Sequence, residues 1–160
     1  MTKIRFVNPQ KQYSDHREEF IKAFDDTLSR GAIVNQQELQ EFEENFAKFV
    51  GVKYAVGVNS GTSALDIALQ AADLKSGDEV ITVAHTFIAT ISCIYLANAK
   101  PILIDVKEDF NMDYKLIETA ITSKTKAIMP VHLNGRLCDM EKINEIAQKL
   151  RNEWTPEKLS

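Results

Sequence analysis

The stretch "EVITVAHTFIATISCIYLANAKPILIDV", residues 79–106, decides the fold class of this protein. It begins and ends with short apolar runs rich in Val and Ile, at 79–83 and 101–106, which are typical of strands covered on both faces. Between them a helical pattern runs from about residue 87 to 96. A strand, a helix and a second strand in close succession predict parallel pairing, with the helix packed on the sheet.

The same alternation continues on both sides of this stretch. Further apolar runs at 54–58 and 126–131 predict two more strands. Helical patterns, with the spacing of one buried face, recur at about 65–72, 113–121 and 140–150. We therefore predict an α/β fold that has a largely parallel sheet with helices on both faces.

The first fifty residues differ, because only helical spacing occurs there. Apolar residues recur three or four positions apart in two stretches, which predicts two amphipathic helices before the first strand. We expect Ser14 to cap the first helix, and Gly31 and Gly51 to end the first and the second. The chain thus divides into N-terminal helices at 1–50 and an α/β part at 51–150.

The composition is that of an ordinary soluble globular protein, with 44% hydrophobic and 26% charged residues among 160. The net charge of −4, with scattered Lys and Arg, argues against nucleic acid as a partner. We see no apolar run that suits a signal peptide or a membrane span, so we expect a cytoplasmic protein without a membrane partner. Cys93 and Cys138 lie in apolar segments without metal-ligand spacing, which predicts reduced thiols in the core.

A predicted strand gives way to a helix through small residues at 58–70, "VNSGTSALDIALQ". The first N–H groups of a helix have no partner inside it and lie at its positive end, where a phosphate can bind. We assign the N–H groups of Thr62 and Ser63, and the Thr62 hydroxyl, to such an anion. The spacing differs from that of the dinucleotide-binding glycines and of the P-loop. The alternative is that the small residues serve only tight packing.

Two histidines lie where other predicted strands end. His85 and Phe87 follow the second predicted strand, and His132 follows the fourth. Ligands in open α/β sheets bind outside the carboxyl ends of the strands, where Phe87 can stack on a planar ring and the histidines can line the site. Alternatively, Phe87 starts the buried face of the next helix and His85 is only a loop residue. We expect no metal, because no Cys or carboxylate completes a ligand set, and we expect Asp105 to cap a turn.

Three segments together resemble the N-terminal part of the DegT-type (DegT/DnrJ/StrS) sugar aminotransferases. They are residues 51–90, 100–106 and 125–147, and the likeness extends over about 6–150. These proteins are pyridoxal-phosphate enzymes of fold type I. The resemblance implies that 1–150 is the N-terminal portion of the large domain of such a transferase, and that this domain is incomplete.

The resemblance also implies roles for particular residues. Gly61, Thr62 and Ser63 match the cradle for the phosphate of pyridoxal 5'-phosphate (PLP), and Phe87 matches the aromatic residue that stacks on the pyridine ring. Asn35 matches a stretch that lies near the active site of a homodimer. The substrates of the complete enzyme would be a nucleotide-linked keto sugar and an amino-acid donor, in the biosynthesis of amino sugars or cell-surface polysaccharides.

Two expected catalytic groups have no counterpart in the chain, the Asp that pairs with the pyridine nitrogen and the Lys that forms the Schiff base. Lys124 and Lys126 lie outside any matching motif, and the polar tail at 151–160 does not continue the pattern. We therefore expect a truncated or fragmentary aminotransferase that is inactive as this chain alone. The alternatives are a non-catalytic ligand-binding or assembly module and a relative of the PLP-dependent sugar dehydratases, while the glycine spacing disfavours a nucleotide-binding oxidoreductase.

Overall fold

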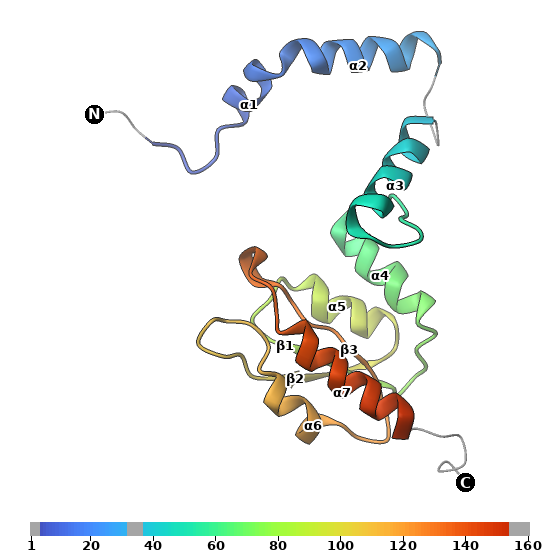
Figure 1. The fold of residues 1–160 in the computed structure, drawn as a ribbon, viewed down its shortest axis with the longest axis vertical. Helices are drawn as coiled ribbons and strands as arrows, with labels where there is room; N and C mark the ends of the chain where they lie inside the picture. The colour runs from blue at the N-terminus through green and yellow to red at the C-terminus, as the bar shows by residue number, and fades with distance from the viewer. Residues whose placement is uncertain (1–3, 32–36, 154–160) are drawn as a thin grey trace. The chain divides into compact units, whose positions relative to one another are not determined.

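The computed structural model describes residues 4–31 and 37–153. The chain divides into two compact units, Met1–Gly57 and Val58–Ser160, whose positions relative to each other are not determined (Figure 1). Each unit is therefore described by itself.

The first unit is helical, with α1 at Pro9–Asp15, α2 at Arg17–Ser29 and α3 at Gln37–Val50. The prediction that Ser14 caps the first helix is wrong. Helix α1 starts earlier, because the Asn8 side chain accepts a hydrogen bond from the Lys11 N–H (3.1 Å) and proline follows it at the first helical position. Ser14 lies inside α1, and its hydroxyl donates to the Lys11 carbonyl (2.9 Å).

The two glycine stops are confirmed. Gly31 follows α2 with φ +66° and Gly51 follows α3 with φ +78°, a left-handed conformation that glycine adopts without steric cost. The Gly51 N–H donates to the Ala47 carbonyl at 2.9 Å, which satisfies one of the last carbonyls of α3.

The prediction of a strand at 54–58 is wrong, since this segment is neither strand nor helix. The Gly57 N–H donates to the Glu43 carboxylate on α3 (2.6 Å) and not to a strand carbonyl. A Cβ on Gly57 would lie 2.7 Å from Leu39 Cδ1, so the glycine permits close packing on α3. An apolar run becomes a strand only when a neighbour pairs with it, and no such neighbour lies beside it in the described part of the chain.

The second unit contains a parallel sheet of three described strands, in the order β2-β1-β3. The strands are β1 at Glu79–Val83, β2 at Lys100–Ile104 and β3 at Thr125–Ile128. The predicted parallel sheet is confirmed. The fourth predicted strand ends sooner than expected, and Pro130, which has no N–H to donate, lies just beyond it.

Helices cover both faces of this sheet, as predicted. Helices α4 (Gly61–Ala71) and α5 (Ala89–Leu96) pack with one face, and α6 (Ile117–Ala120) and α7 (Met140–Glu153) pack with the other. Figure 1 shows α7 in front of the strands. Two short 3₁₀ turns, η1 (Tyr114–Leu116) and η2 (Leu133–Gly135), precede α6 and α7.

The hydrophobic core has two layers, one on each side of β1. Alternate residues of a strand point to opposite faces, so Val80 belongs to one layer, and Ile81 and Val83 belong to the other. Cys93 is buried in the first layer and Cys138 in the second, both as free thiols, which confirms their expected place in the core. No described helix is long and apolar enough to cross a membrane.

We expect Ile81→Ala to lower the free energy of unfolding by about 2–5 kcal/mol, because this fully buried side chain would leave a cavity between β1 and the α6/α7 layer. The matched control is Leu103→Ala on β2, where the side chain is 49% exposed and the expected loss is about 0.5 kcal/mol. Urea unfolding followed by circular dichroism measures both. Equal losses would contradict the assigned core.

Candidate functional site

The order of the strands predicts which edge of the sheet could bind a ligand. Strand β2 lies on one side of β1 and β3 on the other, so the connections that leave β1 and β2 run in opposite directions. In open parallel sheets a crevice forms at such a switch point, outside the carboxyl ends of the strands. Here that switch point lies between the carboxyl ends of β1 and β3.

The start of α4 lies at this same edge. A short connection joins the end of α4 to the start of β1, so the helix runs antiparallel to the strand and its first turn lies near the strand's carboxyl end. Helix α5 begins just after β1 and runs the same way. The first turns of both helices therefore lie at the carboxyl edge of the sheet.

The first turn of α4 presents polar donors to solvent. Ser60 caps the helix, and its Oγ accepts a hydrogen bond from the Ser63 N–H at 3.1 Å, so the expectation that this N–H is left for an anion is wrong. The N–H groups of Gly61 and Thr62 donate to no acceptor among the described residues. Gly61 and Thr62 are exposed, and no heavy atom lies within 4 Å of a Cβ built on Gly61. Two free N–H groups beside the Thr62 hydroxyl fit a phosphate.

The helices α4 and α5 contact each other directly behind this turn. The Cys93 thiol, on α5, donates to the Thr62 carbonyl at 3.5 Å. Burial raises the pKa of the Cys93 thiol above its usual value, and the negative charge of Asp66 adds to the effect. The neutral thiol is therefore the form that packs behind the first turn of α4.

The aromatic residue after β1 is exposed. Phe87 has 73% of its surface accessible, so the alternative that it starts the buried face of the next helix is wrong. The turn that carries it is held by the Phe87 carbonyl, which accepts from the Thr90 N–H (3.1 Å), and by a contact between the hydroxyls of Thr86 and Thr90 (2.8 Å). A fixed turn with an exposed ring suits stacking on a planar ligand.

The two histidines lie in separate environments at the edge. The exposed His85 ring meets the Phe110 ring edge to face, with 5.3 Å between centroids. His132, also exposed, caps η2, and its Nδ1 accepts a hydrogen bond from the Cys138 N–H at 3.1 Å. No group of three or more metal-binding side chains occurs in residues 4–31 and 37–153.

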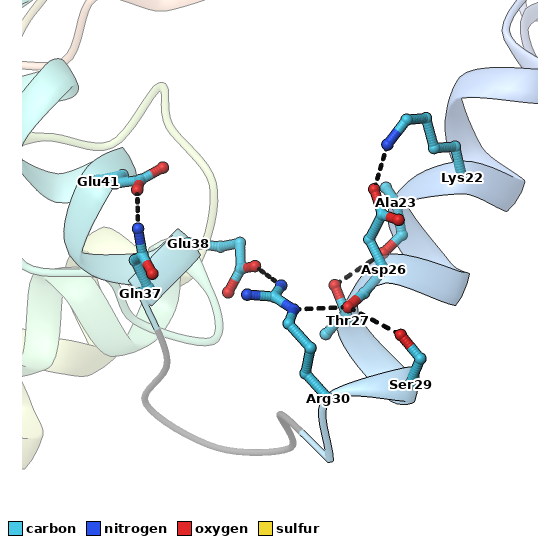
Figure 2. A network of polar contacts seen from close by, with 9 residues as sticks. All are labelled: Lys22, Ala23, Asp26, Thr27, Ser29, Arg30, Gln37, Glu38 and Glu41. Carbon is cyan, nitrogen blue, oxygen red and sulfur yellow. Dashed lines mark hydrogen bonds and ion pairs between the residues drawn. The ribbon is translucent and has the colours of Figure 1, made fainter.

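Asn35 lies outside the described residues. The helix ends on either side of it belong to the first unit, where Arg30 at the end of α2 reaches Glu38 on α3 (Figure 2). The Arg30 guanidinium, through this hydrogen bond, lowers the pKa of the Glu38 carboxyl below its usual value. Arg30 also donates from Nε to the Asp26 carbonyl (2.7 Å), which ties it to α2.

The structure does not decide between the two roles considered for Asp105, a turn cap and a catalytic group. Its carboxylate accepts a hydrogen bond from the next N–H, that of Val106, at 2.8 Å, and Val106 forms a bridge with Met112. The sequence reasoning missed three residues at the edge, Ser60, Phe110 and Asn111. Serine just before a helix is a recognisable N-cap, so Ser60 could have been found. Phe110 and Asn111 make contacts with distant segments that no local pattern reveals.

Comparison with known proteins defines the class. The DegT/DnrJ/EryC1/StrS aminotransferase family matches residues 14–151. A dTDP-3-amino-3,6-dideoxy-alpha-D-galactopyranose transaminase of Aneurinibacillus thermoaerophilus is 40% identical over 147 residues, which are 91% of this chain and 40% of that protein.

Solved structures agree with the sequence match. The S. venezuelae protein DesV, in complex with a ketimine intermediate, has a TM-score of 0.89 at 36% identity, over 93% of this chain and 40% of its own. NtdA from Bacillus subtilis, with bound cofactor PMP, has a TM-score of 0.89 at 33% identity, over 94% of this chain and 35% of its own.

The chain belongs to the DegT/DnrJ/EryC1/StrS aminotransferase family. It spans about two fifths of the length of the curated relatives it matches.

We expect the buried Cys93 thiol to make stability depend on pH. The pKa of the thiol is raised in the folded state. Below the pKa of the unfolded thiol, about 8.5, the neutral thiol therefore makes its full contribution to the free energy of unfolding. This contribution is lost as the pH rises above that value. The difference in unfolding free energy between the wild type and Cys93→Ala should therefore shrink between about pH 7 and about pH 10. Urea unfolding at a series of pH values measures it.

The control is Ile94→Val, in the same core layer, which keeps the thiol. The difference in unfolding free energy between Ile94→Val and the wild type should not change with pH. A Cys93→Ala difference that stays constant over the same range would contradict the assignment.

Proposed function

We propose that this chain forms the phosphate-binding and ring-stacking half of a PLP-dependent aminotransferase site. The observation that carries the proposal is the pair of free N–H groups at Gly61 and Thr62, beside the exposed Thr62 hydroxyl, on the edge of the sheet where Phe87 is also exposed. The fit is to a phosphate joined to a planar aromatic ring, and PLP has both parts.

In this proposal each residue has a physical task. The N–H groups of Gly61 and Thr62 and the Thr62 hydroxyl bind the phosphate, where the helix dipole of α4 favours negative charge. Ser63 contributes its hydroxyl, because its N–H already donates to Ser60. Phe87 stacks on the pyridine ring and fixes the ring plane. PLP, when bound, supplies the means to move an amino group between an amino acid and a keto sugar.

The substrate class follows from the family and its relatives. We infer that the complete enzyme transfers an amino group from an amino-acid donor to a nucleotide-linked keto sugar, for amino-sugar or polysaccharide biosynthesis. The similarity to a dTDP-sugar transaminase supports this inference. We also propose that the enzyme works as a homodimer in the cytoplasm, with Asn35 and the histidines His85 and His132 at the edge of its substrate site.

The first test is cofactor affinity. Thr62→Ala should weaken PLP binding about 10- to 150-fold, since a hydrogen bond to a charged group contributes about 1.5–3 kcal/mol. Phe87→Ala should weaken it about 2- to 12-fold, through the loss of about 0.5–1.5 kcal/mol of stacking. Equilibrium dialysis of PLP against the chain measures both affinities.

Two control variants remove similar groups far from the edge. Thr119→Ala removes an exposed hydroxyl from α6, and Tyr95→Ala removes an exposed ring near the end of α5. Neither should change the affinity for PLP. Unchanged affinities in Thr62→Ala and Phe87→Ala would leave their side chains without a role in binding.

The second test concerns the Schiff base. We propose that neither Lys124 nor Lys126 takes the place of the catalytic lysine, because both lie before or at the start of β3, at the opposite edge of the sheet from Thr62 and Phe87. Reduction of a mixture of the chain and PLP with borohydride should therefore label no single lysine stoichiometrically. Peptide mass spectrometry reads the result. One fully labelled lysine would contradict the proposal, whereas scattered weak labelling agrees with it.

A cofactor that binds without a Schiff base is also what a non-catalytic module or a sugar dehydratase relative would show. The dehydratase alternative lacks the lysine in the complete protein as well, so the presence or absence of that lysine in the complete protein distinguishes it from an aminotransferase.

A further inference from the structure

The loop between β2 and η1, residues 105–113, contacts the segments that follow both other strands. Phe110 packs edge to face on His85, which follows β1. The neighbouring residue, Asn111, hydrogen bonds to the loop that follows β3. One loop thus supports both histidine-bearing segments at the carboxyl edge of the sheet.

Asn111 is fully buried, and both polar atoms of its side-chain amide are hydrogen bonded. The Nδ2 group donates to the carbonyls of Arg136 (3.2 Å) and Leu137 (3.1 Å), and Oδ1 accepts from the Leu133 N–H (3.3 Å). An amide in the interior is costly unless it is satisfied, and here all its partners are main-chain groups of one distant loop. The amide therefore specifies the path of that loop and not the identity of its side chains.

The loop that follows β3 is also held by two hydrogen bonds to His132. The His132 carbonyl accepts from the Gly135 N–H (3.1 Å), and the His132 Nδ1 accepts from the Cys138 N–H (3.1 Å). A ring nitrogen that accepts a hydrogen bond carries no proton, which places the proton of the neutral imidazole on Nε2. The path of residues 133–138 thus decides which nitrogen of His132 can donate to a ligand.

The supporting loop is itself held in an unusual conformation. Phe110 has φ +67°, a region that favours glycine and that bulky residues rarely adopt. The turn is closed by the Phe110 N–H, which donates to the Lys107 carbonyl (2.8 Å), and by the Lys107 N–H, which donates to the Asn111 carbonyl (2.9 Å). Asp109 also accepts from the Asn111 N–H (3.1 Å), and this bond is the main cause of the lowered pKa of the Asp109 carboxyl. The conformation is thus determined from several sides.

We propose that Asn111 is a positioning residue, which holds the 132–138 loop so that His132 presents its Nε2–H at the carboxyl edge of the sheet. The inference rests on the proposed function, because only that function makes the carboxyl edge a ligand site. The hydrogen bonds of Asn111 and His132 do not depend on a bound cofactor. It assigns a role in the site to a residue that lies inside the protein and cannot itself touch a ligand.

The test compares two substitutions of a polar side chain by an apolar one of similar shape. Asn111→Leu removes the amide. The control, Thr122→Val, removes a hydroxyl that donates to the buried Glu79 carboxylate at the opposite edge of the sheet (2.6 Å). Hydrogen exchange followed by mass spectrometry should show exchange about 10- to 100-fold faster at 132–138 in Asn111→Leu, since buried groups left unpaired shift the opening equilibrium by that factor. In Thr122→Val this segment should exchange as in the wild type.

A spectroscopic measurement on the wild-type chain does not depend on the folding of any variant: the ¹⁵N shifts of its His132 imidazole should report the proton on Nε2. In an Asn111→Leu variant that folds, the same shifts should report a mixture of tautomers. A wild-type His132 with its proton on Nδ1, or equal exchange at 132–138 in Asn111→Leu and the wild type, would overturn the proposal.

The dialysis of PLP against the wild-type chain separates this inference from the proposed function. A wild-type chain that does not bind PLP would contradict the proposed function, while the exchange and tautomer results would still decide the role of Asn111.

Discussion

The second unit depends on one constraint, the complete burial of β1. Every residue of Glu79–Val83 is buried, and the strand pairs with a parallel neighbour on each side. Because neither face nor edge of β1 meets solvent, each of its polar groups must be satisfied within the protein. Even the Thr82 hydroxyl, in the middle of the strand, donates to the Met129 carbonyl at 2.9 Å and extends the pairing with β3.

The polar groups at the amino edge of the sheet have partners within the protein, whereas several at the carboxyl edge have none in the described part of the chain. At the amino edge the buried Glu79 carboxylate accepts from the Thr122 hydroxyl and lies 3.7 Å from Nζ of the exposed Lys100, so both a hydrogen bond and an opposite charge stabilise it. At the carboxyl edge the free N–H groups of Gly61 and Thr62 and the ring of Phe87 face solvent. The polar groups at the amino edge are thus satisfied within the protein, whereas those at the carboxyl edge are left exposed.

The site elements at the carboxyl edge differ in how they are supported. The α4 turn supports itself, since the Ser60 cap and the Cys93 contact are local to the α4/α5 layer. The His132 loop is supported from another segment, through Asn111. Substitutions behind α4 should therefore act mainly through that layer, whereas the loop after β3 is sensitive to changes in the chain between β2 and α6.

The sequence by itself determined the features that local physics controls. The apolar runs at 79–83 and 101–106, the stops at Gly31 and Gly51, and the small residues before α4 can each be recognised from a few neighbouring positions, because strand burial, left-handed backbone and helix termini have short-range signatures. Their order along the chain sufficed to predict the parallel sheet and the family.

Only the tertiary structure decided the remaining features. The run at 54–58 has the same composition as the strands but finds no partner in the described structure, and pairing is a property of two segments. Asn8 takes the cap that Ser14 was expected to form, because Asn8 stands before the proline that starts α1. Asn111 joins its loop to residues 22 to 26 positions further along the chain. A hydrogen bond across that separation exists only after the sheet has brought the two loops together, so no local pattern can contain it.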